Sequence, residues 1–376
     1  MPFPPVEPQR TVPRGAVLRH AAPMAGAEEV REQRLLAQGL GLPASRSPVD
    51  AVRLLLGVQS QELAHALWSL ALRSEATTEH EVRARLDAGD VVRTHVLRPT
   101  WHLVAAEDVR WLFATTAGRV HQANTSAYRS HGLDAAARDR GAAAIADVLA
   151  DGTPRTRPEL AAVLTDAGLP STGVALASLV MHAELEQVII SGPARGAAQT
   201  HVLMDARVPR GPADGADPVR LLRRFLAGHG PASVRDVARW SSLTLAVVRA
   251  ALAELRDELA EVEVAGVTYF VVPGGSGGAA VPPVLLLPLY DELPLSYRDL
   301  AHPRPADHPH RPGTDQFVGS VVAGGADLGT WRREVRGRAV EVALDLAPST
   351  PEALRAGAEE QARRLAGFLD RELVLR

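Results

Sequence analysis

The sequence predicts an α+β fold, in which three tandem winged-helix motifs are followed by a β-barrel-like domain with a closing helix. Two observations predict it. A pattern of three helices and a hairpin recurs three times before Pro273, and after Pro273 the sequence changes to alternating strands and one amphipathic helix. Recurrence of one pattern in a fixed order indicates a repeated structural unit more strongly than any single copy does.

The last copy of the pattern is the clearest. Apolar residues at helical spacing end at Gly230, Ser233 and Thr244 stand where helix N-caps are expected, and Gly266 divides two alternating segments. Three helices and a hairpin are therefore expected over residues 217–230, 233–242, 244–259 and 260–272.

The two earlier copies follow the same order less regularly. In the middle copy, we expect helices over 137–152, 157–168 and 172–186, and two strands within 187–204. In the first copy, we expect helices within 48–73 and over 77–89, and a hairpin over 90–104.

The chain after Pro273 is expected to form a small β-rich domain. A Gly-rich linker leads to a buried strand and turn over 284–299, antiparallel strands over 319–345, and a helix over 350–373 capped by Thr350. The predicted domains are a flexible Pro-rich leader at 1–27, winged helices at 28–130, 131–212 and 213–274, and the C-terminal domain at 275–376.

Composition excludes several classes of protein. The chain has 376 residues and no cysteine, which excludes disulfides, thiolate metal sites and a cysteine nucleophile. The net charge of −3 argues against strong, indiscriminate binding to nucleic acid, but it does not exclude a local basic channel. No apolar run approaches the roughly 20 residues of a membrane span, and the start of the chain lacks a secretory signal. We expect a cytoplasmic, nucleoid-associated monomer that does not bind membranes.

Major-groove readout by the expected third helices is not favoured. The helix at 172–186 has no arginine, and the arginines of the helix at 244–259 lie among acidic residues. The loop that contains His302, His308 and His310 is crowded with proline, so a solvated loop is favoured over a metal site there.

Two other segments carry candidate polar groups. If residues 98–102 are a strand, then Arg98, Thr100 and His102 share one face that could meet phosphates or a base, or be ordinary polar surface. Asp291 and Glu292 are adjacent, so a regular strand would point them apart; a catalytic role and a turn-capping role for Asp291 both stay open.

Gln59 and Gln61 follow an apolar helical run within the segment LLLGVQSQELAHALW. In a continuous helix their side chains would point about 200° apart, so both could not serve one cavity. Either one glutamine has no role in the site, or the backbone leaves the helix near Gly57, where glycine lowers helix stability. Glutamine accepts and donates hydrogen bonds but does not titrate.

Six segments in order resemble the AlkZ/YcaQ superfamily of bacterial DNA glycosylases. They are RLLAQGL, LLGVQSQELAHALWSLALR, VVRTHVLRPTWHLVAAEDVRWL, SVRDVARWSSL, LLPLYDELPLSYRD and LGTWRREVRGRAVEV. The family's catalytic motif of two glutamines flanking one residue falls on Gln59 and Gln61. Gln61 indicates the AlkZ-like branch, because the YcaQ branch has aspartate there. Two residues differ from the usual pattern: Ser60 replaces an apolar residue, and Pro99 replaces a glycine before the Thr-x-His element.

The resemblance implies a C-shaped arrangement of the winged helices and a monofunctional enzyme without a cofactor or a metal. Its partner would be double-stranded DNA carrying bulky or crosslinked N7-alkylated purines, often in self-resistance to an alkylating natural product. Catalysis is expected from Gln59 and Gln61. DNA binding is expected from Arg98, Thr100, His102, Arg332, Arg333 and Arg336.

The chemistry of such a substrate suits two glutamines. An N7-alkylguanine is already cationic and leaves as a neutral base, so it needs no general acid. Water must still be positioned and developing charge on the sugar stabilised, which amide carbonyls can do. Two alternatives remain: a non-catalytic winged-helix regulator or damage sensor, and a scaffold that binds protein.

Overall fold

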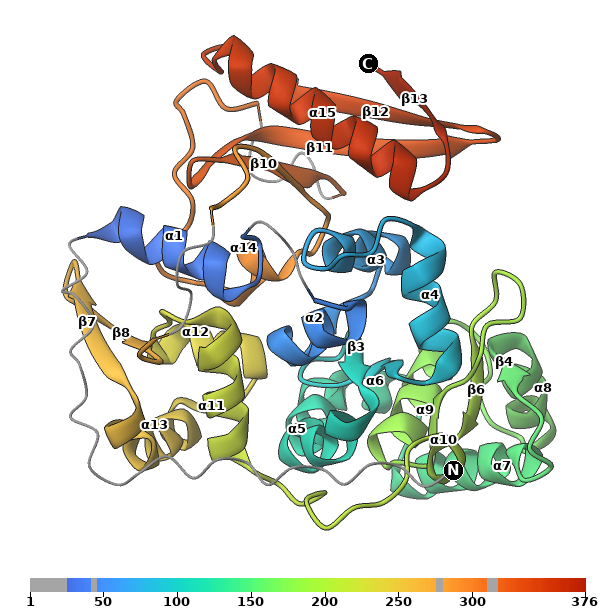
Figure 1. Cartoon of the computed structure of the whole chain (residues 1–376). Coiled ribbons are helices and arrows are strands. Elements are labelled where there is room, and N and C mark those ends of the chain that lie inside the picture. The colour runs from blue at the N-terminus through green and yellow to red at the C-terminus, as the bar shows by residue number, and fades with distance from the viewer. Residues whose placement is uncertain (1–25, 42–45, 275–279, 310–316) are drawn as a thin grey trace, which may run out of the picture.

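The computed structural model describes residues 26–41, 46–274, 280–309 and 317–376. It is an α+β structure with several separate sheets, which confirms the α+β part of the predicted fold class (Figure 1). The expected leader at residues 1–27 lies almost wholly outside the described residues, and α1 (Ala27–Ala37) begins at its end. No helix in the described ranges is both long and apolar enough to cross a membrane.

The first part of the chain combines helices with a three-stranded sheet in the order β1-β3-β2. Two further helices, α5 and α6, were not predicted. The elements are α2 (Pro48–Leu55), β1 (Val58–Gln59), α3 (Leu63–Ala71), α4 (Glu79–Ala88), β2 (Val91–His95), β3 (Trp101–Ala105), the 3₁₀ turn η1 (Ala106–Asp108), α5 (Val109–Ala123) and α6 (Thr125–Ser130).

The middle part has three helices and a sheet in the order β4-β6-β5. Its elements are α7 (Ala135–Leu149), β4 (Arg155–Thr156), α8 (Arg157–Asp166), α9 (Gly173–Leu185), β5 (Ile189–Ser191), β6 (Thr200–Leu203) and α10 (Met204–Arg207). Strand β5 also contacts β2 of the first part, so the two sheets meet edge to edge.

The third part follows the expected order of helices and hairpin. Its elements are α11 (Pro218–His229), α12 (Val234–Ser241), α13 (Leu245–Glu254), the 3₁₀ turn η2 (Arg256–Glu258), β7 (Ala260–Val264) and β8 (Val267–Val271). Ser233 and Thr244 are the N-caps that the sequence predicts, and their side chains accept hydrogen bonds from Asp236 N and Val247 N. Interpretation of the three parts as tandem winged helices in a C-shape stays a prediction.

The C-terminal part is a five-stranded sheet in the order β13-β12-β11-β10-β9, with α15 packed against it (Figure 1, top). Among the described residues the edge strands β9 and β13 do not pair with each other, so the sheet is open and lacks the closure of the predicted barrel. Its elements are β9 (Leu285–Leu287), α14 (Glu292–Ser296), β10 (Gly319–Ala323), β11 (Ala326–Arg336), β12 (Ala339–Leu346), α15 (Glu352–Phe368) and β13 (Glu372–Leu375).

Two details at the end of the chain differ from the prediction. The residue that caps α15 is Pro351 rather than Thr350, and it makes no side-chain cap. The helix ends at Phe368 instead of continuing to residue 373. Asp370 has a positive φ of 53°, which turns the chain back, and β13 then pairs in parallel with β12.

Close packing joins the first and third parts of the chain. Gly228 on α11 lies so near α2 that a Cβ atom there would approach Leu54 O to 2.0 Å, so only glycine fits. Arg34 on α1 is buried and donates to Asp236 on α12 across 3.1 Å, while its guanidinium lies 3.8 Å from the ring centre of Tyr297. These contacts fix α11 beside α2, and α12 and Tyr297 beside α1.

Candidate active site

The backbone leaves helical geometry immediately before the two glutamines. Helix α2 ends at Leu55, and its C-cap Leu56 has a φ of 63°. Gly57 is the next residue. A Cβ atom added there would lie 3.1 Å from Leu97 Cδ1, which is closer than most Cβ contacts. Helix α3 begins only at Leu63. The structure therefore selects the second alternative that the sequence left open, a break near Gly57.

Between the two helices the chain is extended and pairs with β3. Gln59 lies opposite His102, and the Ser60 N–H donates to Trp101 O across 2.7 Å. Gln59 is 9 % exposed, whereas Gln61 is exposed. Strand β1 ends at Gln59, and Gln61 lies in the bend before α3, so neither glutamine is helical and the opposition that a continuous helix would impose on them does not apply.

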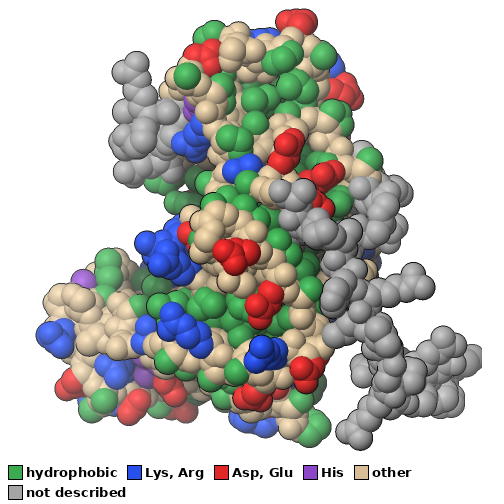
Figure 2. All heavy atoms as spheres, turned by 90° about the vertical axis from the view of Figure 1, so that its left-hand side faces the viewer, with side chains coloured by type: hydrophobic (Ala, Val, Ile, Leu, Met, Phe, Trp, Pro, Cys, Tyr) green, Lys and Arg blue, Asp and Glu red, His purple; other side chains and the backbone are tan. Residues whose placement is uncertain are grey.

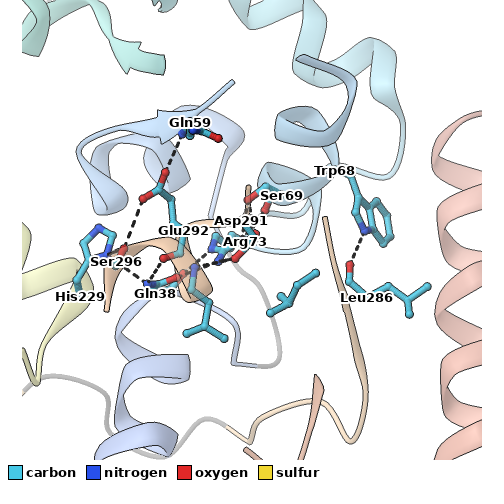
Figure 3. Close-up of polar contacts among 12 residues, drawn as sticks. Gln38, Gln59, Trp68, Ser69, Arg73, His229, Leu286, Asp291, Glu292 and Ser296 are labelled. Atoms are coloured by element: carbon cyan, nitrogen blue, oxygen red, sulfur yellow. Dashed lines mark hydrogen bonds and ion pairs between the residues drawn. The ribbon is translucent and has the colours of Figure 1, made fainter. Parts of the chain in front are cut away.

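A buried carboxyl group fixes the position of Gln59 (Figure 3). The Gln59 N–H donates to Glu292 Oε1 across 2.7 Å, and the Trp240 indole N–H donates to Glu292 Oε2 across 2.8 Å. Glu292 is fully buried. Burial raises its pKa, while the charge of Arg98 and the two donated hydrogen bonds oppose the rise. Glu292 thus joins the glutamine segment, α12 and α14 in one contact.

The network behind Glu292 is neutral and closely paired (Figure 3). Ser296 Oγ lies 3.0 Å from His229 Nδ1, and the amide nitrogen of Gln38 lies 3.2 Å from the same atom. His229 Nε2 lies 3.1 Å from Leu55 O, which makes Nε2 the protonated nitrogen. Burial lowers the pKa of His229 to about 3, so the ring is neutral near pH 7.

Asp291 has a structural role. Its carboxylate pairs with Arg73 across 2.7 Å, accepts from Ser69 Oγ across 2.7 Å, and caps α14 by accepting from Leu293 N. Burial alone would raise the pKa of Asp291, but Arg73 and these hydrogen bonds lower it. The turn-capping alternative is confirmed. A carboxylate held charged in this way is poorly suited to donate a proton.

The side-chain oxygen of Gln59 lacks a hydrogen-bond partner among the described residues. Gln59 Oε1 is buried and makes no hydrogen bond to any described residue. Such an atom costs free energy unless it meets water or a ligand. Its neighbours on the chain are held tightly: Arg93 donates to Ser60 O across 2.7 Å and to Gln61 O across 3.3 Å, and its guanidinium stacks on the Trp101 ring.

The hairpin residues do not share a strand face as the sequence analysis expected. Arg98 and Thr100 lie in the turn before β3, because Pro99 cannot donate to a sheet, and only His102 lies in the strand. His102 is fully buried. Its Nδ1 lies 2.9 Å from Thr100 O, and its Nε2 lies 3.2 Å from an Arg98 nitrogen. In this structure His102 is therefore covered and contacts Arg98.

Arg332, Arg333 and Arg336 lie on β11 and line one surface pocket, although they differ in exposure and in their partners. Alternation along the strand places Arg332 and Arg336 on one face and Arg333 on the other. Arg336 pairs with Glu334 across 2.8 Å. Arg333 is partly buried, and its positive charge interacts with Glu79 on α4 and with His65 on α3. Arg332 is exposed and makes no ion pair with a described residue, so it is the freest of the three to meet a phosphate.

Arg93 and His229 escaped the sequence analysis, which considered Glu292 only as the neighbour of Asp291. Glu292, Arg93 and His229 come from distant parts of the chain, and no local spacing links them to Gln59. A further buried pair lies nearby: His95 Nδ1 is 2.6 Å from Glu184 Oε2, beside the Trp101 ring. Burial would raise the pKa of Glu184, but His95 and His201 lower it to about 2.

The histidine loop is less solvated than expected. His302 Nδ1 lies 2.7 Å from Gly325 O, and the buried side chain of His308 faces Asp327. His310 lies outside the described residues. These two histidines therefore anchor the loop to the start of β11.

Comparison with known proteins identifies the class of protein. A sequence model of a family described as DNA glycosylase AlkZ-like matches residues 52–368. The chain therefore belongs to the AlkZ-like DNA glycosylase family, and it is a DNA glycosylase that acts in DNA repair. A comparison with curated proteins gives no match.

A solved structure has the same fold. The chain is 22 % identical to the Streptomyces sahachiroi DNA glycosylase AlkZ, with a TM-score of 0.72 over 94 % of this chain and 100 % of that one. At this identity the likeness concerns the fold alone.

Proposed function

We propose that the protein is a monofunctional glycosylase that hydrolyses the N-glycosidic bond of N7-alkylated purines in double-stranded DNA, bulky or crosslinked adducts included. We further propose that it serves self-resistance to a DNA-alkylating natural product. The observation that carries the catalytic part is the buried, unpartnered Oε1 of Gln59 on a backbone that Glu292 holds in place.

The proposed chemistry follows from the neutrality of the glutamines. The substrate base carries a positive charge before reaction and leaves as a neutral molecule, so no acid is needed. Gln59 Oε1 accepts a hydrogen bond from the attacking water. Gln61, exposed two residues further on, contributes a second amide dipole toward the sugar as positive charge develops there.

The nearby carboxyl groups are assigned other tasks. Asp291 is neutralised by Arg73. Both carboxyl oxygens of Glu292 accept hydrogen bonds, one from the Gln59 N–H and the other from the Trp240 indole N–H. Placed behind the Gln59 backbone, Glu292 is proposed to position the glutamine and not to protonate the base.

DNA binding is proposed to involve Arg98, Thr100 and Arg332, with His102 acting through Arg98. Arginine side chains on the face drawn in Figure 2 lie scattered among acidic and hydrophobic ones. On that face the arginines do not form a continuous basic surface. Arg333 and Arg336, which line the same surface pocket as Arg332, are proposed to contribute as well.

The test is incubation of the protein with duplex DNA that carries an N7-alkylguanine, followed by hot alkali in half of each sample. Alkali-dependent strand breaks at the lesion support a monofunctional glycosylase. Breaks without alkali would indicate a lyase activity as well. Binding without any break would favour the alternative of a non-catalytic damage sensor.

A further inference from the structure

A cluster of three metal-ligating side chains lies outside the glutamine site, where helices α5, α6 and α9 meet. It consists of His121 on α5, His182 on α9 and Glu186 at the C-cap of α9. One ligand atom from each of the three lies within 4.8 Å of the others. His182 and Glu186 are four residues apart, which places them on one face of the helix.

One histidine of this cluster, His182, lacks the hydrogen-bond partners that buried imidazoles usually have among the described residues. His182 is 4 % exposed, and neither of its ring nitrogens makes a hydrogen bond to a described residue. His121 Nε2 lies 3.0 Å from Glu186 Oε1, and His121 Nδ1 lies 3.0 Å from the Tyr128 hydroxyl. A hydroxyl on the second nitrogen is the kind of contact that orients metal-bound histidines.

The local electrostatics suit a cation. His121 and His182 both stand in the last turns of their helices, where the unpaired carbonyl groups concentrate negative potential. Glu186 and Asp139 add two carboxylates, with Asp139 Oδ1 lying 3.6 Å from His182 Nε2. Arg138 opposes them with one positive charge. It is held aside by Leu133 O at 2.9 Å and by the Tyr128 ring.

We propose that His121, His182 and Glu186 form a binding site for a divalent transition-metal ion, of which Zn²⁺ is the best match. Two imidazoles and one carboxylate are a common zinc ligand set, which leaves a fourth position for water. Bonds of about 2.1 Å in a tetrahedron separate ligand atoms by roughly 3.4 Å, so small side-chain movements close the site. A surface pocket of about 700 Å³ that His121 and Tyr128 line supplies an entry path.

The metal would join two parts of the chain. Helix α5 belongs to the first predicted domain and α9 to the second, so an ion held by both would link them. The sequence did not predict this site. The chain has no cysteine, and the proline-rich loop that contains His302, His308 and His310 did not favour a metal site. The pairing of His182 and Glu186 at helical spacing was visible in the sequence, but their link to His121 depends on the fold.

The test uses tag-free full-length protein that has been stripped with a chelator and then titrated with Zn²⁺ against a chromophoric competitor. We expect one equivalent to bind and to raise the thermal midpoint of unfolding. His182→Ala and Glu186→Gln should each weaken binding at least about tenfold and remove the thermal shift. His80→Ala, which changes an exposed histidine on α4, should behave like wild type.

Cobalt(II) gives an independent readout, since tetrahedral coordination by nitrogen and oxygen produces visible absorption bands that an unbound ion lacks. Glu186→Gln changes a half-exposed side chain, so this variant is expected to fold. It therefore tests the site even if His182→Ala does not fold. Failure of the wild type to bind zinc, or equal binding by wild type and Glu186→Gln, would overturn the proposal.

Discussion

The backbone N–H of Gln59 donates to the carboxyl group of Glu292 across 2.7 Å, although the two residues are 233 positions apart in the chain. Glu292 is buried, stands at the first turn of α14, and uses its other oxygen for Trp240. The segment of the candidate motif is therefore positioned by the C-terminal part of the protein. This link gives Glu292 either a positioning role or, because burial raises its pKa, the role of an acid.

Substitution of Glu292 separates these roles. With Glu292→Gln, the amide oxygen still accepts from one donor, but its NH₂ group faces the other, so we expect a loss of about tenfold in excision rate from a buried hydrogen bond worth about 1.4 kcal/mol. The loss should be smaller than that of Gln59→Ala. The measurement is the single-turnover rate on 7-methylguanine as a function of pH.

The shape of the pH profile distinguishes a positioning role of Glu292 from the role of an acid. A positioning role predicts the same profile for wild type and Glu292→Gln, because the cationic base requires no proton. A wild-type rate that declines as an acid titrates, together with a flat residual rate in Glu292→Gln, would make Glu292 the catalytic acid.

His229 should make the protein less stable as the pH falls. Burial lowers its pKa in the folded state to about 3 from the usual 6.5, so the unfolded chain binds the extra proton between these values. Its contribution to the free energy of unfolding is present above about pH 6.5 and is lost as the pH falls, by up to about 1.4 kcal/mol per pH unit.

The check is denaturant unfolding of wild type and His229→Gln at several pH values within that window. The variant should lose stability less steeply than wild type, while His80→Gln, at an exposed site, should keep the wild-type slope. Equal slopes for wild type and His229→Gln would show that His229 is charged in the folded protein.

Arg332 should contribute to DNA affinity without reading sequence. Arg332→Ala removes an exposed guanidinium from β11, so binding should weaken similarly for all duplexes, and the slope of log affinity against log salt should fall by about one. Fluorescence anisotropy at several salt concentrations measures both quantities. Arg140→Ala, which changes an exposed arginine on α7, is the matched control. Unchanged affinity and slope would make Arg332 an ordinary surface residue of the sheet.

The sequence was informative where local rules decide. Ser233 and Thr244 cap helices as predicted, because N-capping depends on a few neighbouring residues. Gly266 has a φ of 73° and lies at the turn of the predicted hairpin. The β13 strand was missed, because the apolar spacing that predicts α15 continues past Asp370, where the helix has already ended.

The site was predictable in its motif but not in its surroundings. The resemblance named Gln59 and Gln61, yet only the fold shows that α2 ends at Leu55 and that the next residues pair with β3. The contacts of Gln59 with Glu292 and of Arg93 with Ser60 join residues far apart in the chain, which no local periodicity reports. Arg98 and His102 were placed on one face by strand alternation, and Pro99 breaks that alternation.

The central claim is that two neutral amides, acting without a general acid, remove only bases that are already cationic. The most direct test is single-turnover excision from matched duplexes that contain 7-methylguanine, a bulky N7-alkylguanine or uracil. We predict that wild type releases both cationic bases and leaves uracil, and that Gln59→Ala and Gln61→Ala each slow release by about 10²–10³-fold with DNA affinity nearly unchanged. Gln122→Ala, at an exposed glutamine of α5, should match wild type. Efficient removal of uracil, or full activity in the double alanine variant, would contradict the account.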